Sequence, residues 1–153
     1  MKKVILSLLI GFLLIESTFS QIKKVNVDVD GFFEIVVKVN DGSISVNQIG
    51  EIVDVELGGD VDYNYSRQIS SVGSVSIGYN YSGNISSVGS TSLGYNYSGN
   101  ISSVGSTSIG YNYSGKVSSI GSTSYGYNYS GKISSGNRVV SINGITFSLK
   151  GGY

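Results

Sequence analysis

Hydrophobic and polar residues alternate along much of this chain with a period of two, which is the pattern of β-strands. In residues 107–113 the odd-numbered positions hold Thr, Ile, Tyr and Tyr, and the even-numbered positions hold Ser, Gly and Asn. Residues that form helices poorly dominate these segments, and a Gly recurs about every five or six residues. The pattern therefore predicts an all-β fold.

A 16-residue unit repeats from residue 63 to residue 136, and each copy opens with Tyr-Asn-Tyr-Ser. The five copies begin at Tyr63, Tyr79, Tyr95, Tyr111 and Tyr127. Near-identical units at a fixed spacing indicate a tandem-repeat architecture, in which each unit packs on its neighbours. This signal is strong and decides the fold class.

Each unit contains two turns that use glycine. A Ser-Gly pair such as Ser98-Gly99 is predicted to form a two-residue hairpin loop. A Gly-Ser pair such as Gly105-Ser106 is predicted to form a type II′ turn, which favours Gly at its first position. Each unit is then a hairpin, in which a seven-residue strand such as 107–113 pairs with a five-residue strand such as 116–120.

The unequal strand lengths predict a sheared antiparallel sheet that either remains a coiled sheet or closes partly into a barrel-like tube with tyrosine and isoleucine side chains inside. The alternative is a parallel β-solenoid with one unit per coil, which would stack Tyr on Tyr along the array. The two-residue turns favour the hairpins. Strand polarity is the observation that separates the two folds.

The segments on both sides of the array, residues 21–62 and 137–153, read as degenerate hairpins that are more aliphatic than the repeats. Asp30-Gly31 and Asn143-Gly144 are the expected turns, and Asn-Gly is the preferred pair of a type I′ turn. We expect both flanks to cap the array, because its terminal units must cover an exposed edge.

Residues 111–121, Tyr-Asn-Tyr-Ser-Gly-Lys-Ile-Ser-Ser-Ile-Gly, resemble the tyrosine-rich hairpin repeats of the YD type. They are more similar to uncharacterised secreted repeat proteins of Bacteroidota, whose units end in a similar Ile-Gly. The resemblance covers about residues 63–136, and it departs from true YD repeats by lacking the Asp after Tyr and the Gly-Arg turn pair. It implies an exported β-hairpin array and no particular activity.

Residues 1–20 have the features of a secretory signal peptide. Two lysines precede an apolar stretch at residues 4–15, and small residues lead to an expected cleavage between Ser20 and Gln21. The apolar stretch is shorter than the roughly twenty residues of a membrane span. We therefore expect an exported protein, located in the periplasm, at the cell surface or outside the cell, that is not inserted in a membrane after the signal is removed.

Charge is distributed unevenly along the chain, although the formal net charge is zero. Residues 21–62 hold nine acidic residues and three lysines, whereas residues 63–153 hold five basic residues and no acid. Five cations spread over the array are too few for a nucleic-acid interface. The distribution favours solubility and end-to-end complementarity between copies of the chain.

The sequence argues against catalysis. There is no His and no Cys, so the usual nucleophile–base pairs are missing. The acidic residues alternate with valines, as in residues 53–56, which is typical of a strand with one solvated face. Residues 28–31 and 58–62 faintly resemble calcium loops but lack the required spacing. We expect no enzyme activity, no cofactor and no metal.

The tyrosines are the best candidates for an interaction surface, since ten of the twelve come from Tyr-Asn-Tyr. On an outer face, paired rings with amides between them would form a platform for sugar rings or for a protein. On an inner face they would be core, which the scarcity of other large residues favours. The candidate surface comprises Tyr79, Tyr81, Tyr95, Tyr97, Tyr111 and Tyr113, with Asn80, Asn96 and Asn112.

Three functions are compatible with these features. The first is a structural or surface-interaction role in the cell envelope or outside the cell. The second is a functional amyloid-like fibre subunit, which the Tyr, Asn and Ser rows, the low charge and the absence of proline favour. The third is a glycan-binding module that uses Tyr and Asn. The corresponding partners are a second copy of the chain, another protein or a glycan.

Overall fold

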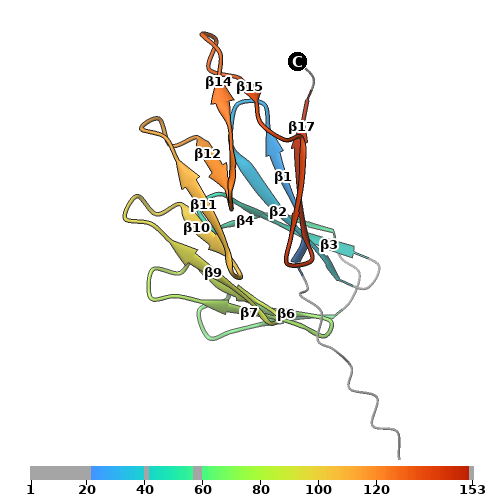
Figure 1. Cartoon of the computed structure of the whole chain (residues 1–153). Coiled ribbons are helices and arrows are strands. Elements are labelled where there is room, and N and C mark those ends of the chain that lie inside the picture. Colours follow the sequence, from blue (N-terminus) through green and yellow to red (C-terminus); the bar gives the residue numbers. More distant parts are fainter. Residues whose placement is uncertain (1–21, 40–41, 57–59, 152–153) are drawn as a thin grey trace, which may run out of the picture.

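The computed structural model describes residues 22–39, 42–56 and 60–151, and the predicted signal peptide lies outside these ranges (Figure 1). Every regular element in the described part is a β-strand, which confirms the all-β prediction. No helix that could span a membrane occurs among these residues. The strands form two large sheets that face each other and a short two-stranded ribbon (Figure 1).

The first sheet is built from both flanks of the repeat array. Its strand order is β16-β17-β1-β2-β3-β4, and all neighbours are antiparallel except β1 and β17, which are parallel. The two flanks, which we expected at opposite ends of the array, thus lie side by side in one sheet. Its strands are β1 (Ile22–Asp28), β2 (Phe33–Val39), β3 (Gly42–Asn47), β4 (Ile52–Glu56), β16 (Val139–Ile142) and β17 (Ile145–Lys150).

The second sheet comes from the repeats, and its strands follow one another in sequence order from β5 to β13. All its neighbours are antiparallel, which confirms the hairpins and rules out the parallel solenoid. The last unit forms the separate ribbon of β14 and β15. The strands are β5 (Val61–Tyr63), β6 (Ile69–Val72), β7 (Val75–Tyr79), β8 (Ile85–Val88), β9 (Thr91–Tyr95), β10 (Ile101–Val104), β11 (Thr107–Tyr111), β12 (Val117–Ile120), β13 (Thr123–Ser124), β14 (Gly126–Tyr127) and β15 (Ile133–Ser135).

The turn after the first tyrosine of each unit is longer than predicted. Strand β11 ends at Tyr111 instead of Tyr113, and the Asn112 N–H donates to the Lys116 carbonyl at 2.9 Å. Gly115 has a φ of +73°, so the loop matches the three-residue hairpin loop that ends in a left-handed glycine. The predicted two-residue Ser-Gly loop is wrong, because the Asn112 side chain holds a wider turn. We name this end of each hairpin the tip.

The turns at the other end of the hairpins agree with the prediction. Val104 pairs with Thr107, so Gly105 and Ser106 form a two-residue loop, and the Gly105 φ of +57° fits the first position of a type II′ turn. In the C-terminal hairpin, the Asn143-Gly144 turn has φ values of +52° and +79°, as a type I′ turn requires.

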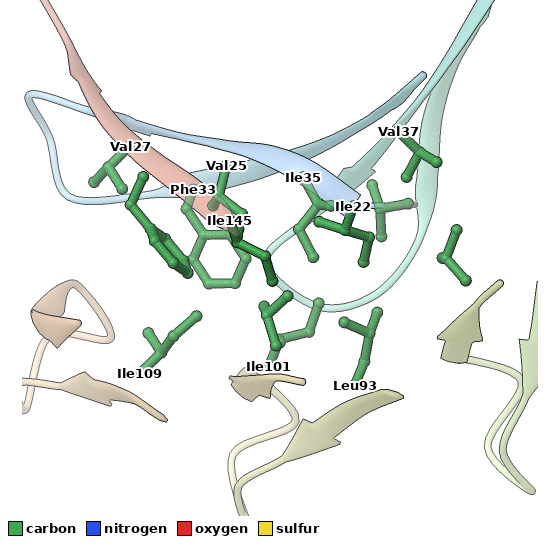
Figure 2. Close-up of a cluster of buried hydrophobic side chains, with 14 of the residues drawn as sticks. Ile22, Val25, Val27, Phe33, Ile35, Val37, Leu93, Ile101, Ile109 and Ile145 are labelled. Carbon is green, nitrogen blue, oxygen red and sulfur yellow. The ribbon is translucent and has the colours of Figure 1, made fainter. Parts of the chain in front are cut away.

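The core lies between the two sheets. Val25, Phe33 and Ile35 from the first sheet point toward Leu93 and Ile101 from the repeat sheet (Figure 2). The outward side of the repeat sheet carries little but serine and glycine, so this sheet has one apolar face only. Of the two predicted forms, the antiparallel hairpin sheet is confirmed and the barrel-like tube is not: the flanking sheet supplies the second apolar layer, and the fold is a two-layer β-sandwich.

Backbone hydrogen bonds also join the sheets, at a site that recurs with the repeat. A register shift of one residue in the β7–β8 pair puts a β-bulge at the start of β8, and such a bulge turns one N–H out of the ladder. The Ile85 N–H donates to the Gly50 carbonyl of the first sheet at 3.1 Å. The equivalent bonds run from Ile101 to Gln48, from Val117 to Gly31 and from Ile133 to Val29.

Candidate binding surface on the hairpin tips

Each tip is held rigidly by its asparagine. In the third unit the Asn96 Oδ1 accepts the backbone N–H groups of Ser98 and Asn100, each at 3.0 Å. The Gly99 N–H donates to the Asn96 carbonyl at 3.0 Å, which closes the loop a third time. Asn80 and Asn112 make the same side-chain bonds in their own units. These asparagines therefore shape the tip, and their Oδ1 atoms are occupied by it.

The second tyrosine of each unit stands at the tip and is fully exposed. Because the strand ends at the first tyrosine, two residues earlier, the ring of the second tyrosine lies outside the sheet and is surrounded by solvent. The tips lie in a row along the left side of the molecule in Figure 1. The exposed rings are those of Tyr65, Tyr81, Tyr97, Tyr113 and Tyr129, which we name the tip row.

The first tyrosine of the second to fifth units is half-buried and belongs to the scaffold. The Tyr79, Tyr95 and Tyr111 hydroxyls donate to the carbonyl oxygens of Ile69, Ile85 and Ile101, at 2.8, 2.5 and 2.5 Å. Tyr127 bonds to Val117 in the same way. In every case the acceptor lies ten residues earlier, in the preceding unit. These hydroxyls thus form a ladder that joins each unit to the one before it.

The candidate surface predicted from the sequence therefore divides into three parts. Tyr81, Tyr97 and Tyr113 stand in the tip row, the three other tyrosines lie between the units, and the three asparagines hold the turns. Tyr65 and Tyr129 complete the row and were missing from the prediction. Their signal was the repeat itself, since each occupies the same position of its unit as Tyr97.

Burial raises the pKa of the four tyrosines whose hydroxyls form the ladder, which we call the inner tyrosines. The pKa is about 12 for Tyr95 and for Tyr127, and it is raised also for Tyr79 and Tyr111. Burial is the main cause throughout, and for Tyr127 the negative charge of Asp28 and the nearby Tyr125 contribute. The neutral phenol is the form that the hydroxyl ladder needs, because it donates a hydrogen bond to a carbonyl.

We expect the free energy of unfolding to fall between about pH 10 and pH 12. An unfolded tyrosine loses its proton near pH 10, whereas Tyr95 and Tyr127 hold theirs to about 12. In this interval the native state binds more protons than the unfolded state, so stability decreases as pH rises. Urea unfolding at a series of pH values measures this slope.

The double variant Tyr95→Phe/Tyr127→Phe should have a shallower alkaline slope than the wild type. The variant Tyr97→Phe/Tyr129→Phe is the control, since it removes two hydroxyls from the tip row and leaves the ladder intact. An unchanged slope in the inner double variant would contradict the role of the ladder hydroxyls.

An open hollow of about 760 Å³ lies between the third and fourth tips. It combines aromatic rings with amide and hydroxyl groups, and the ring of Tyr113 stands on its rim. Its lining consists of Asn96, Ser98, Asn100, Tyr111, Asn112, Tyr113, Gly115 and Ser118. Since the units are nearly identical, the same combination of groups is presented at successive tips.

A smaller and more apolar hollow of about 410 Å³ adjoins the first and shares Asn100 and Gly115 with it. Phe32 and Ile49, from the β1–β2 and β3–β4 turns, line this second hollow and are partly exposed. Gln48 fixes its floor, because the Gln48 Nε2 donates to the Asn100 Oδ1 at 3.1 Å and to the Gly115 carbonyl at 2.9 Å. The turns of both sheets thus contribute to one end of the sandwich.

The chemistry of the tips is aromatic, polar and almost uncharged. A tip consists of Tyr, Ser and Gly or Arg between an asparagine and a residue that begins the return. Tyr gives a large rigid contact area at a low entropy cost, while Ser, Gly and Asn supply adaptable hydrogen bonds. In the described ranges no three acidic side chains gather as metal ligands would. The tips therefore offer aromatic contact area together with hydrogen-bonding groups.

Comparison with known proteins adds no relative to this picture, because no family model, no curated protein and no solved structure matches the chain.

Proposed function

We propose that this chain is an exported, non-catalytic protein that works through contacts at its surface, and that its tip row binds an extended glycan. The observation that carries the proposal is the full exposure of five tyrosine rings on five successive turns. Large apolar surfaces arranged in a row mark interaction sites on soluble proteins. The predicted signal peptide and the resemblance to secreted repeat proteins are the reasons to propose export.

The periodicity of the row favours a polymeric partner. Each of the first four units adds two strands to the sheet, so their tips follow at about 9.5 Å, twice the spacing of paired strands. This interval is close to the length of a disaccharide in an extended β-linked glycan. A ligand of that kind would meet a Tyr-Ser-Gly turn at each step after the first tip, which has Tyr-Ser-Arg, and each added tip would raise the effective concentration for the next contact.

The groups at each tip suit sugar rings. The C–H face of a pyranose packs against an aromatic ring, and its hydroxyls need hydrogen-bond partners around the edge. Tyr111 and Tyr113 line the hollow between tips together with Asn96 and Ser98, so both kinds of contact are at hand. The absence of His and Cys from the chain and the near-absence of charge from the tips support a role without catalysis.

The test is binding to immobilised and soluble β-linked glycans by the wild type and by Tyr81→Ser/Tyr97→Ser/Tyr113→Ser. We expect the triple variant to lose at least about tenfold in affinity, since each ring contributes on the order of 1 kcal/mol. Longer oligosaccharides should bind the wild type more tightly than short ones. The fold should be unaffected, because none of the three rings is buried.

The matched control is Ser90→Ala/Ser106→Ala/Ser122→Ala, which changes three exposed residues at the opposite ends of the same hairpins. It should bind as the wild type does. A wild type that binds no glycan on a broad array, or a triple variant that binds as tightly as the wild type, would refute the glycan proposal. Loss of a protein partner in the triple variant alone would assign the tip row to protein recognition instead.

A further inference from the structure

The hydroxyl ladder of the repeat array is incomplete at both ends. Each inner tyrosine donates to the carbonyl ten residues before it, in the preceding unit. Tyr63 opens the array and has no preceding unit, since residue 53 lies in β4 of the other sheet. Its ring is 63 % exposed, whereas the rings of the four later members are half-buried. Among the described residues, the ladder thus begins with a tyrosine that has no carbonyl of a preceding unit to donate to.

The other end of the array has the complementary gap. Ile133 begins the last returning strand and occupies the position that Val117 and Ile101 hold in earlier units. The carbonyls of Val117 and Ile101 each accept a tyrosine hydroxyl from the following unit. Ten residues after Ile133 stands Asn143, in the turn between β16 and β17. The ladder thus ends with an acceptor position that has no tyrosine to follow it.

The strands at the two ends of the array, β5 and β15, each have an edge that pairs with no strand in the described part of the chain, and the two edges can pair with each other as neighbouring units do. β5 is the terminal strand of the nine-stranded sheet, and β15 pairs with β14 alone in the described part of the chain. Within the array, a returning strand pairs antiparallel with the leading strand of the next unit, as Ser119 of β12 does with Ser124 of β13. By the repeat, the equivalent pair across two copies is Ser135 and Asp60.

Charge also favours contact between unlike ends. Around β4 and β5, residues 51–62 hold five acidic residues and no basic one. Toward the other end, residues 116–150 hold four basic residues and no acid, and of these Lys132 is paired with Asp30 of the first sheet at 3.6 Å. Opposite charges steer unlike ends together, and like charges oppose the pairing of two identical ends. Unpaired strand edges are the usual sites at which such a contact forms.

We propose that a second copy of this chain docks head to tail, with its β5 edge on the β15 edge of the first copy. The Tyr63 hydroxyl of one copy then donates to the Ile133 carbonyl of the other and continues the ladder. Ser135 and Asp60 lie opposite each other across the joint. The contact is between different surfaces of the two copies, so it does not close into a dimer and can extend into a filament. The tip rows of successive copies then continue in line.

The absence of cysteine from the chain allows a direct test by disulfide trapping. Full-length mature protein carrying Asp60→Cys is mixed with protein carrying Ser135→Cys, under mild oxidation and over a range of concentrations. Residues directly opposite on paired antiparallel strands are within disulfide range. We expect at least about ten times more crosslinked heterodimer than from Asp60→Cys mixed with Ser103→Cys, since Ser103 holds in mid-array the position that Ser135 holds in the last unit and is already paired with Ser108.

Self-association and the crosslinking controls test the proposal further. Self-association measured by sedimentation should weaken with added salt, and it should weaken several-fold in Tyr63→Phe but not in Tyr65→Phe. Crosslinking of Asp60→Cys to itself, together with thioflavin binding, would overturn the proposal in favour of an in-register amyloid-like fibre. Equal crosslinking in the Ser103→Cys control, or none at millimolar concentration, would also overturn it.

Discussion

Replacing Phe147 by alanine is expected to lower the free energy of unfolding by about 3–5 kcal/mol, the usual cost of deleting a fully buried phenyl ring. Phe147 is 1 % exposed and is the largest of the fully buried side chains. It lies on β17, where it pairs with Val25 of β1 on one side and with Val140 of β16 on the other. The C-terminal hairpin thus reaches the centre of the first sheet and the shared core.

The transition should also stay cooperative. Because the apolar layer of the repeats is covered by the flanking sheet, loosening that sheet exposes both halves of the core at once. Urea unfolding followed by circular dichroism and by tyrosine fluorescence should give one shifted transition with both signals. Phe32→Ala is the control, because its ring is 46 % exposed in a turn and its loss should cost much less. Two separate transitions would show that the repeats fold without the flanks.

The sequence was sufficient for the elements that depend on local chemistry. The alternation of residues 107–113 predicted a strand, which the structure shows over Thr107–Tyr111. The Asn143-Gly144 turn was placed correctly because few residue pairs accept two positive φ values. The antiparallel polarity followed from the same reasoning, since a two-residue Gly-Ser turn can join only antiparallel strands. Each of these conclusions rests on a few neighbouring residues, so no long-range contact was needed to reach it.

The arrangement of the sheets depended on contacts that a single sequence does not reveal. The parallel pair of β1 and β17 joins residues more than a hundred positions apart, and no local pattern announces it. Without that pair, the apolar face of the repeats had no partner, and self-closure into a tube was the remaining way to bury it. The alternation of residues in the two flanks predicted strands, but it did not indicate that the strands of both flanks form one sheet.

The division of the tyrosines depended on one residue of the turn. With a two-residue Ser-Gly loop, Tyr111 and Tyr113 would share a face, and both would be core or both surface. The Asn112 side chain instead accepts two N–H groups of the loop, so the strand stops at Tyr111 and the second ring is released to solvent. The sequence shows the asparagine at this position but does not show whether its side chain faces the turn or a ligand.

Replacing Gly50 by alanine is expected to lower the free energy of unfolding by about 2–5 kcal/mol, from two separate causes. Gly50 lies in the β3–β4 turn with a φ of +82°, a conformation that an L-residue adopts only with strain. A Cβ there would lie 1.9 Å from the hydroxyl oxygen of Tyr95 and 2.9 Å from its Cζ. The Tyr95 side chain is half-buried and packs against the core. The same ring supplies the ladder bond to Ile85.

Gly99→Ala separates these two causes. Gly99 has nearly the same φ, +80°, but nothing lies within 4 Å of the Cβ that alanine would add. Its expected cost is therefore the backbone strain alone, about 1–2 kcal/mol. The difference between the two variants in the free energy of unfolding, measured with urea, gives the energetic effect of the contact between the β3–β4 turn and Tyr95 of the hydroxyl ladder. If the two variants lower the free energy of unfolding by the same amount, the added methyl group of Gly50→Ala does not clash with Tyr95. The β3–β4 turn and the Tyr95 ring would then not be in close contact.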